Sequence, residues 1–298
     1  MHLYARRCTT VDKLLHRSCS HTHCTAMMRA LLICAAVTHA LVPTLPTPRR
    51  AQRSASLMMA EKKDDVAVVI LAGGTGSRMK ADRPKQFLPL RGKMIIKYSL
   101  DLFLNDIEGI CKVVVVLAEQ YRQDFKEYAD RVTFADPGAE RQDSVKSGLD
   151  SCPDDAALVA IHDAARPLVT PDEIYSVFGD AREHGAAVLG VPVKATVKES
   201  GDGKFVLRTV DRSRLWEVHT PQVIEPSLLK RGFAKVDSEK LEITDDVSVV
   251  EQLGAPVRLT LGEYTNLKVT TPDDMVVAGQ ILDQRRGKKG WRKLLFWK

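Results

Sequence analysis

From residue 65 onward, short apolar runs alternate with amphipathic segments. The apolar runs are rich in β-branched residues and almost uninterrupted, which is typical of strands buried on both faces of a sheet. They predict strands at 65–72, 112–118, 157–165 and 186–193. The segments between them show helical spacing, or Pro and acidic residues where a helix begins. These segments predict helices at 93–103, 119–129, 143–151 and 171–185.

This alternation predicts a three-layer α/β/α fold with a mostly parallel sheet and helices on both faces. Ligands of such folds bind at the carboxyl ends of the strands. The pattern changes at 194–224, where two short strands joined by the Gly-Asp-Gly turn at 201–203 predict a projecting β-hairpin arm. From composition alone, the arm either packs against another subunit or is a surface decoration.

Charge divides the chain into three parts. Residues 1–63 carry ten Lys or Arg and two acidic residues, and residues 284–298 carry seven Lys or Arg and no acidic residue. Because the whole chain has a net charge of +6, residues 64–283 carry about −9. We therefore expect a leader at 1–63, a globular body at 64–283 and a basic tail at 284–298. An acidic body argues against nucleic acid as a partner.

The leader has the composition of a targeting sequence. An apolar run at 30–37 is followed by small residues at 38–40, as in a secretory signal and its cleavage site. Residues 41–60 contain Arg, Ser, Thr and Pro but no acid, as in a transit peptide. This bipartite order predicts import into the plastid stroma, with Met27 or Met28 as the true start; the alternative is a disordered tail. The apolar run is too short to span a bilayer, so no transmembrane segment is expected in the mature protein.

A glycine-rich loop follows the first predicted strand. The sequence LAGGTGSRM at 71–79 has three glycines within four positions, and Arg78 and Lys85 add positive charge beside them. Glycine lets a ligand approach the backbone closely, and backbone N–H groups with two cations suit phosphate oxygens. The loop matches neither the P-loop nor the dinucleotide-binding pattern, because no lysine follows Gly76 and Met79 stands where a third glycine is needed.

Further motifs, in order along residues 65–283, resemble those of one enzyme family. Besides the glycine loop and RPKQF at 83–87, they are GAERQDSVKSGL (138–149), HDAARPLV (162–169), ATVK (195–198), TVDR (209–212), HTPQV (219–223), ITDDVSVVE (243–251) and YTNLKVTTPDD (264–274). Together they resemble the plant-type 2-C-methyl-D-erythritol 4-phosphate cytidylyltransferases. The resemblance implies a Rossmann-like nucleotidyltransferase fold that transfers CMP from CTP to methylerythritol phosphate, with release of pyrophosphate, in the non-mevalonate isoprenoid pathway.

The resemblance also implies which residues bind CTP. Arg78, Lys85 and Lys268 are the implied catalytic cations, and Asp163 is the implied ligand of a Mg²⁺ ion between the phosphates. The implied contacts to CTP are Ala72, Gly73, Gly74, Gly76, Gly138, Ala139, Ser144 and Asp163. Ala139 departs from many bacterial relatives, which carry a polar residue there, so only backbone contacts are expected at this position.

The methylerythritol phosphate site comes from the resemblance as well. Its implied residues are Arg166, Thr196, Arg212, Thr220, Thr244 and Lys268. In the family the arm reaches across to the neighbouring subunit, which implies a homodimer. Asp245 and Asp246 are expected to orient these cations or hydroxyl groups. We interpret His162 as structural, because a phosphate nucleophile is already ionised and needs no general base.

Three alternatives remain open at this point. A cytidylyltransferase for another polyol or sugar phosphate, such as ribitol 5-phosphate, would share these motifs. A non-catalytic nucleotide-binding protein would have lost one of the reacting-centre cations, and all three are present. The tail, which mixes cations with aromatic residues, either contacts an anionic membrane or a partner, or only adds solubility. Cys111 and Cys152 are the body's two cysteines, too few for a disulfide framework.

Overall fold

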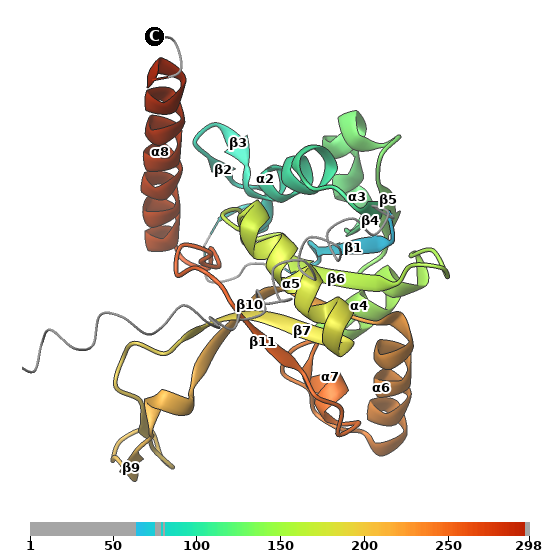
Figure 1. The fold of residues 1–298 in the computed structure, drawn as a ribbon, viewed down its shortest axis with the longest axis vertical. Helices are drawn as coiled ribbons and strands as arrows, with labels where there is room; N and C mark the ends of the chain where they lie inside the picture. Colours follow the sequence, from blue (N-terminus) through green and yellow to red (C-terminus); the bar gives the residue numbers. More distant parts are fainter. Residues whose placement is uncertain (1–63, 75–78, 80, 296–298) are drawn as a thin grey trace, which may run out of the picture. The chain divides into compact units, whose positions relative to one another are not determined.

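The computed structural model describes residues 64–74, 79 and 81–295 of the 298-residue chain, with side chains as far as residue 287. At its centre lies a seven-stranded sheet with the strand order β11-β7-β10-β6-β1-β4-β5 (Figure 1). The strands are β1 Val66–Leu71, β4 Ile110–Val116, β5 Thr133–Ala135, β6 Leu158–Asp163, β7 Ala186–Pro192, β10 Trp216–Ile224 and β11 Arg258–Leu261. β10 is antiparallel to β6 and β7, and the other pairs are parallel. The predicted, mostly parallel sheet is confirmed.

Helices cover both faces of the sheet. They are α2 Ile95–Asp101, α3 Glu119–Arg122, α4 Arg141–Asp150, α5 Pro171–His184, α6 Pro226–Glu239, α7 Ser248–Glu251 and α8 Pro272–Leu295. Successive residues of a strand point to opposite faces of its sheet. Accordingly, Val68 of β1 lies in the apolar cluster that contains residues of α2 and α5, whereas Val69 lies in the cluster of α4, α6 and α7. This arrangement confirms the three-layer α/β/α class.

Two predicted helices differ from the structure in their extent. The helix predicted at 93–103 begins only at Ile95, because Lys93–Met94 (β3) pairs with Pro89–Leu90 (β2) in a small antiparallel hairpin. It then continues as a π-helix over Leu102–Asp106. The helix predicted at 119–129 is a single α-helical turn, α3, followed by a 3₁₀ segment at Gln123–Tyr128. Phe125, with φ −125° and ψ 25°, breaks its helical geometry.

The apolar pattern does not reveal β10, although this strand lies in the middle of the sheet. β10 begins with polar positions and contains Pro221, which cannot donate to a ladder hydrogen bond. The structure accommodates this proline at an interruption of the pairing with β7, between Val218 and Gln222. The strands β5 and β11 were also missed, because three or four residues are too few to show a period.

The predicted arm is present, but it is shorter than 194–224. Its two strands are β8 Lys198–Glu199 and β9 Arg208–Thr209, which pair antiparallel on either side of a turn that contains Gly203. The chain then enters the main sheet at Trp216, so the part after that residue belongs to β10. Figure 1 shows the arm leaving the sheet from the ends of β7 and β10.

The helix α8 continues past residue 284, where the basic tail was expected to begin. Its first half packs on the body, where Ala278 joins a small apolar cluster with Leu90 and Ile95. An ion pair of 2.8 Å between Arg91 and Asp283 also holds it there. Within the described residues, no helix is both long enough and apolar enough to cross a membrane.

Two helical glycines provide a matched test of how α4 packs on the sheet. A Cβ atom at Gly148 of α4 would lie 2.4 Å from Cγ1 of Val69, whereas a Cβ at Gly179 of α5 would meet nothing within 4 Å. We expect Gly148→Ala to lower the free energy of unfolding by about 1–3 kcal/mol through overpacking. Gly179→Ala should raise it by about 0.5–1 kcal/mol, because alanine has the higher helix propensity. Urea unfolding measures both; equal effects would contradict close packing at Gly148.

Candidate active site

A cavity of about 390 Å³ opens at the carboxyl ends of β1 and β6, where ligands of α/β folds bind. Its lining comes from five separate parts of the chain: Leu71, Gly73, Gly74, Lys85, Gln86, Gly138, Ala139, Glu140, Arg141, Ser144, Asp163, Ala164, Ala165 and Lys268. The volume falls within the range of roughly 300–1,000 Å³ that is usual for small-molecule sites. The lining mixes exposed main chain with charged side chains, which suits a polar, anionic ligand.

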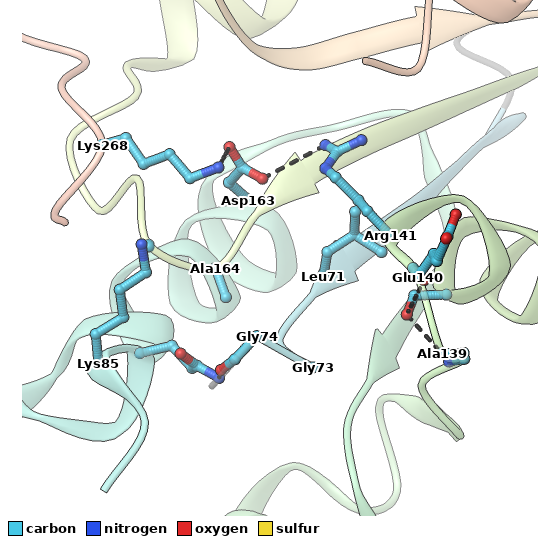
Figure 2. Close-up of a pocket in the computed structure, with 14 residues that line it drawn as sticks. Leu71, Gly73, Gly74, Lys85, Ala139, Glu140, Arg141, Asp163, Ala164 and Lys268 are labelled. Carbon is cyan, nitrogen blue, oxygen red and sulfur yellow. Dashed lines mark hydrogen bonds and ion pairs between the residues drawn. The ribbon is translucent and has the colours of Figure 1, made fainter. Parts of the chain in front are cut away.

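Gly73 and Gly74, at the start of the glycine loop, line the lower side of this cavity as it is drawn in Figure 2. The N–H of Ala72 still donates to the carbonyl of Val116, at 2.9 Å, so the loop leaves directly from the sheet. A Cβ atom at Gly73 would lie 2.7 Å from Cβ of Pro137, so a larger residue there would push the loop away. At Gly74 a Cβ would meet nothing within 4 Å. Glycine there leaves main chain open to a ligand.

Asp163, the last residue of β6, is the negative centre of the cavity. Its carboxylate lies 2.8 Å from Nζ of Lys268, 3.5 Å from Nη2 of Arg141 and 3.4 Å from Nε of Arg166. Figure 2 shows it between Lys268 and Arg141, with Lys85 on the same side of the cavity as Lys268. Burial alone would raise the pKa of this carboxyl, but the three cations together hold it well below its usual range. Asp163 is therefore ionised at neutral pH.

Arg141 also forms an ion pair with a second carboxylate, that of the buried Asp246. Its guanidinium pairs with Oδ1 of Asp246, whose backbone N–H donates to Oε1 of Gln222 at 2.9 Å. Burial disfavours the charged form of Arg141, yet the charge and hydrogen bond of Asp246 raise its pKa. Asp245 instead accepts from the N–H of Ser248, at 3.0 Å. Asp246 thus pairs with a cation, but this cation is Arg141 and not one of those expected in the acceptor site.

The segment 138–144 meets the cavity at the first turn of α4. A Cβ atom at Gly138 would lie 2.1 Å from Cβ of Asp143, so this tight turn requires glycine. The hydroxyl of Ser144 accepts from the N–H of Gly138, at 3.1 Å, and donates to the carbonyl of Glu140, at 3.2 Å. Ser144 therefore shapes this turn in addition to lining the cavity. Ala139 also lines it.

Several predicted residues lie behind the cavity lining. Arg166 is buried and donates to the carbonyls of Asn266, at 2.7 Å, and Val218, at 3.3 Å. The hydroxyl of Thr220 accepts from the N–H of Asp163 and lies 3.2 Å from Nδ1 of His162. Both side chains hold the backbone around Asp163. A direct contact of either with methylerythritol phosphate stays a prediction.

His162 is fully buried, and its ring nitrogen Nε2 lies against two protein groups. Its Nε2 lies 3.1 Å from the hydroxyl of Ser99 and 3.2 Å from the carbonyl of Arg166. Burial lowers its pKa to about 4. This position agrees with the interpretation of His162 as structural.

Of the remaining predicted residues, those that the structure describes are not among the residues that line the cavity. Thr196 and Arg212 are exposed on the arm, where the guanidinium of Arg212 donates to the carbonyl of Lys194. Thr244 lines a smaller neighbouring cavity, of about 70 Å³, together with Arg141. Ala72 is buried beneath the loop. Gly76 and Arg78 lie outside the described residues.

Sequence reasoning did not single out Gln86, Arg141 or the Ala164–Ala165 pair, although all of them line the cavity. Each lies inside a motif that was recognised for a neighbouring residue: Gln86 in RPKQF, Arg141 in GAERQDSV and the alanines in HDAARP. The motif itself was therefore the feature of the sequence that could have identified these residues. Only the folded chain shows which of its side chains face the cavity.

Comparison with known proteins shows the family to which the chain belongs. The model of the 2-C-methyl-D-erythritol 4-phosphate cytidylyltransferase family matches residues 66–284. The chloroplastic enzyme of that name from Oryza sativa subsp. japonica is 49% identical over 230 residues, covering 76% of this chain and 77% of the rice protein. That from Halalkalibacterium halodurans is 41% identical, covering 74% and 98%. The crystal structure of the Thermus thermophilus enzyme superposes with a TM-score of 0.63 at 32% identity, covering 74% and 99%.

A mostly parallel sheet with a glycine loop and converging cations at its carboxyl edge defines an enzyme of the nucleotidyltransferase class. Within that class, the chain belongs to the 2-C-methyl-D-erythritol 4-phosphate cytidylyltransferase family.

The buried imidazole of His162 predicts a pH dependence of stability. The unfolded chain has a histidine pKa of about 6.5 and binds a proton that the folded chain, with its pKa near 4, excludes. The contribution of His162 to the free energy of unfolding is therefore fully present above about pH 6.5 and is lost as the pH falls toward 4. We expect the free energy of unfolding of the wild type to fall about 1.4 kcal/mol per pH unit more steeply than that of His162→Gln in this window.

The measurement is urea unfolding at several pH values. His184→Gln, at an exposed position of α5, is the matched control. Equal slopes for the wild type and His162→Gln would show that His162 is not excluded from protonation in the folded state.

Proposed function

We propose that the protein transfers CMP from CTP to 2-C-methyl-D-erythritol 4-phosphate, giving 4-diphosphocytidyl-2-C-methyl-D-erythritol and pyrophosphate. One observation carries the proposal beyond family membership: Lys85 and Lys268, which are 183 residues apart in the sequence, line one cavity with the glycine loop. A phosphate oxygen of the acceptor attacks the α-phosphorus of CTP, and the bond to the β-phosphate oxygen breaks. Two polyanions must meet in this reaction, so catalysis consists of positioning and charge stabilisation.

Each cavity group has a role in this reaction. The main chain of Gly73 and Gly74 lies against the triphosphate, and the turn at Gly138 and Ala139 contacts the cytidine. Lys85 and Lys268 stabilise the charge on the reacting and leaving phosphates, together with Arg78. A phosphate acceptor is already ionised at neutral pH, so the reaction needs no general base.

The cavity suits a Mg²⁺ ion that is bound by one carboxylate of the protein together with the phosphates of the substrate. In the described part of the chain, no group of three or more His, Cys, Asp or Glu residues is placed to hold a metal. Mg²⁺ is commonly bound by one or two carboxylates together with substrate phosphates. Asp163, which is ionised and lines the cavity, would hold it with the phosphates of CTP. The ion would neutralise phosphate charge when bound.

The acceptor site requires residues that a single chain does not bring to the cavity. Thr196 and Arg212 are exposed on the arm, and the arm also exposes Phe205, Val206 and Leu207, with 76%, 60% and 67% of their surface accessible. Exposed apolar side chains of this kind favour a protein interface. We therefore assign a homodimer in which the arm of each chain completes the acceptor site of the other. The guanidinium of Arg212 suits the acceptor phosphate, because it donates two parallel hydrogen bonds.

The site of action we propose is the plastid stroma. Its support is the chloroplastic location in the name of the rice relative and the composition of residues 1–63. The signal and transit peptides expected within residues 1–63 lie outside the described residues.

The proposal is tested by pyrophosphate release from residues 64–298, which keep α8 entire. CTP with methylerythritol phosphate and Mg²⁺ should give the fastest turnover, and EDTA should abolish it. Faster turnover with ribitol 5-phosphate would identify the alternative acceptor. Turnover with UTP equal to that with CTP would contradict base selection by the turn at 138–144.

The two lysines predict a specific kinetic loss. We expect Lys85→Ala and Lys268→Ala each to lower kcat by about 10²–10³-fold, as the loss of one preorganised donor to a transition state does. Lys126→Ala, at an exposed position outside the cavity, serves as the charge-matched control. Steady-state kinetics with both substrates saturating measures the effect. A fall of tenfold or less would reduce either lysine to a binding residue.

If two chains share each acceptor site, a variant of Arg212 and a variant of Lys268 should complement each other in a heterodimer. Arg212→Ala and Lys268→Ala should each be nearly inactive alone. In a heterodimer of the two, isolated through two different affinity tags, one of the two sites has both residues, so about half of the wild-type activity should return. Absence of any return, or a monomer at assay concentration, would show that Arg212 acts within its own chain or not at all.

A further inference from the structure

Gln86 is a buried polar residue that lines the cavity without a role in the mechanism so far. The residue is 3% exposed, and its side chain amide lies against the start of the glycine loop. Nε2 donates to the carbonyl of Ala72, at 2.5 Å, and to the carbonyl of Gly74, at 2.9 Å. A primary amide has two N–H groups, so both donors of Gln86 are used on this one loop.

These two hydrogen bonds determine which way the peptide groups of the loop face. In a planar trans peptide, the carbonyl of one residue and the N–H of the next point in opposite directions. Holding the carbonyl of Ala72 against Gln86 therefore turns the N–H of Gly73 to the opposite side. The two bonds also give a donor to the carbonyl oxygens of Ala72 and Gly74, which would otherwise repel a triphosphate in the cavity.

The same residue connects the loop to a catalytic lysine. Lys85–Phe87 form one 3₁₀ turn, in which the three successive side chains have different surroundings. Lys85 lines the cavity, Gln86 bonds to the loop, and Phe87 is buried in the core, with its ring centroid 4.7 Å from that of Tyr121. Phe87 anchors the turn, and Gln86 sets the distance between the loop and Lys85.

We propose that Gln86 is a positioning residue for nucleotide binding and catalysis. Its amide holds the triphosphate-binding main chain in the orientation that presents N–H groups to phosphate, and in register with Lys85. The inference rests on the proposed function in taking CTP as the nucleotide. A carboxylate of the same shape at this position would place its lone pairs against the two carbonyls and its charge beside the phosphates.

The test compares Gln86→Met and Gln86→Glu in the full-length chain. Gln280→Met, at an exposed position of α8, is the matched control. Gln86→Met keeps the length of the side chain and removes both donors. We expect its kcat/KM for CTP to fall about 10²-fold, the order of loss from a displacement of about 1 Å in a site. The KM for methylerythritol phosphate should stay within about threefold of the wild type.

Gln86→Glu separates positioning from a general loss of structure. A protonated carboxyl regains one donor, so the activity of this variant should rise relative to that of Gln86→Met as the pH is lowered from 8 to about 5.5. A purely structural defect would give the two variants the same pH profile. Parallel profiles, or a kcat/KM for CTP of Gln86→Met within threefold of the wild type, would overturn the inference.

Measuring CTP binding directly tests the role of Gln86 separately from the proposed reaction. If the wild type released no pyrophosphate with methylerythritol phosphate, the proposed function would fail, and calorimetry with CTP alone would still test Gln86. At least tenfold weaker CTP binding by Gln86→Met than by Gln280→Met would support its positioning role. Equal affinities, or no binding of CTP by the wild type, would overturn it.

Discussion

The buried carboxylate of Asp163 holds the active site together. A buried ion is unfavourable unless charged or hydrogen-bonding groups surround it. Here Arg166 provides one from three residues further along the chain, and Arg141 and Lys268 provide the others from distant segments. The hydroxyl of Thr220 accepts from the backbone N–H of Asp163. The need to compensate this one charge therefore brings α4, the end of β6 and the segment before α8 to the same edge of the sheet.

The charges of the cavity do not cancel. Among the described residues that line it, Lys85, Arg141 and Lys268 stand against Glu140 and Asp163, which leaves one excess positive charge at neutral pH. Low-dielectric walls strengthen the field of such an excess, and a polyanionic substrate relieves it. The body as a whole is acidic, with about −9 over residues 64–283, so this local excess is a property of the site. It also explains why the cavity suits a triphosphate and a second phosphate together.

The antiparallel strand β10 connects the arm to the charged groups of the cavity. It brings Thr220 beside Asp163 and Gln222 beside Asp246, and the chain that precedes it forms the arm. Gln86 has a comparable role on the other side of the cavity, where it joins the glycine loop to Lys85.

The layer architecture could be predicted from the order of the amino acids, because the β-branched runs and the helical spacing are local properties. The sequence also located the glycine loop, Lys85, Asp163 and Lys268, since these residues lie in ordered motifs. It did not reveal β10, whose proline and polar positions are tolerated only at a break in its pairing with β7. Nor did it separate side chains that line the cavity, such as Arg141 and Gln86, from those that support it, such as Arg166 and Thr220. This distinction needs the folded chain, because the partners of a polar side chain depend on which distant backbone groups and charges surround it after folding.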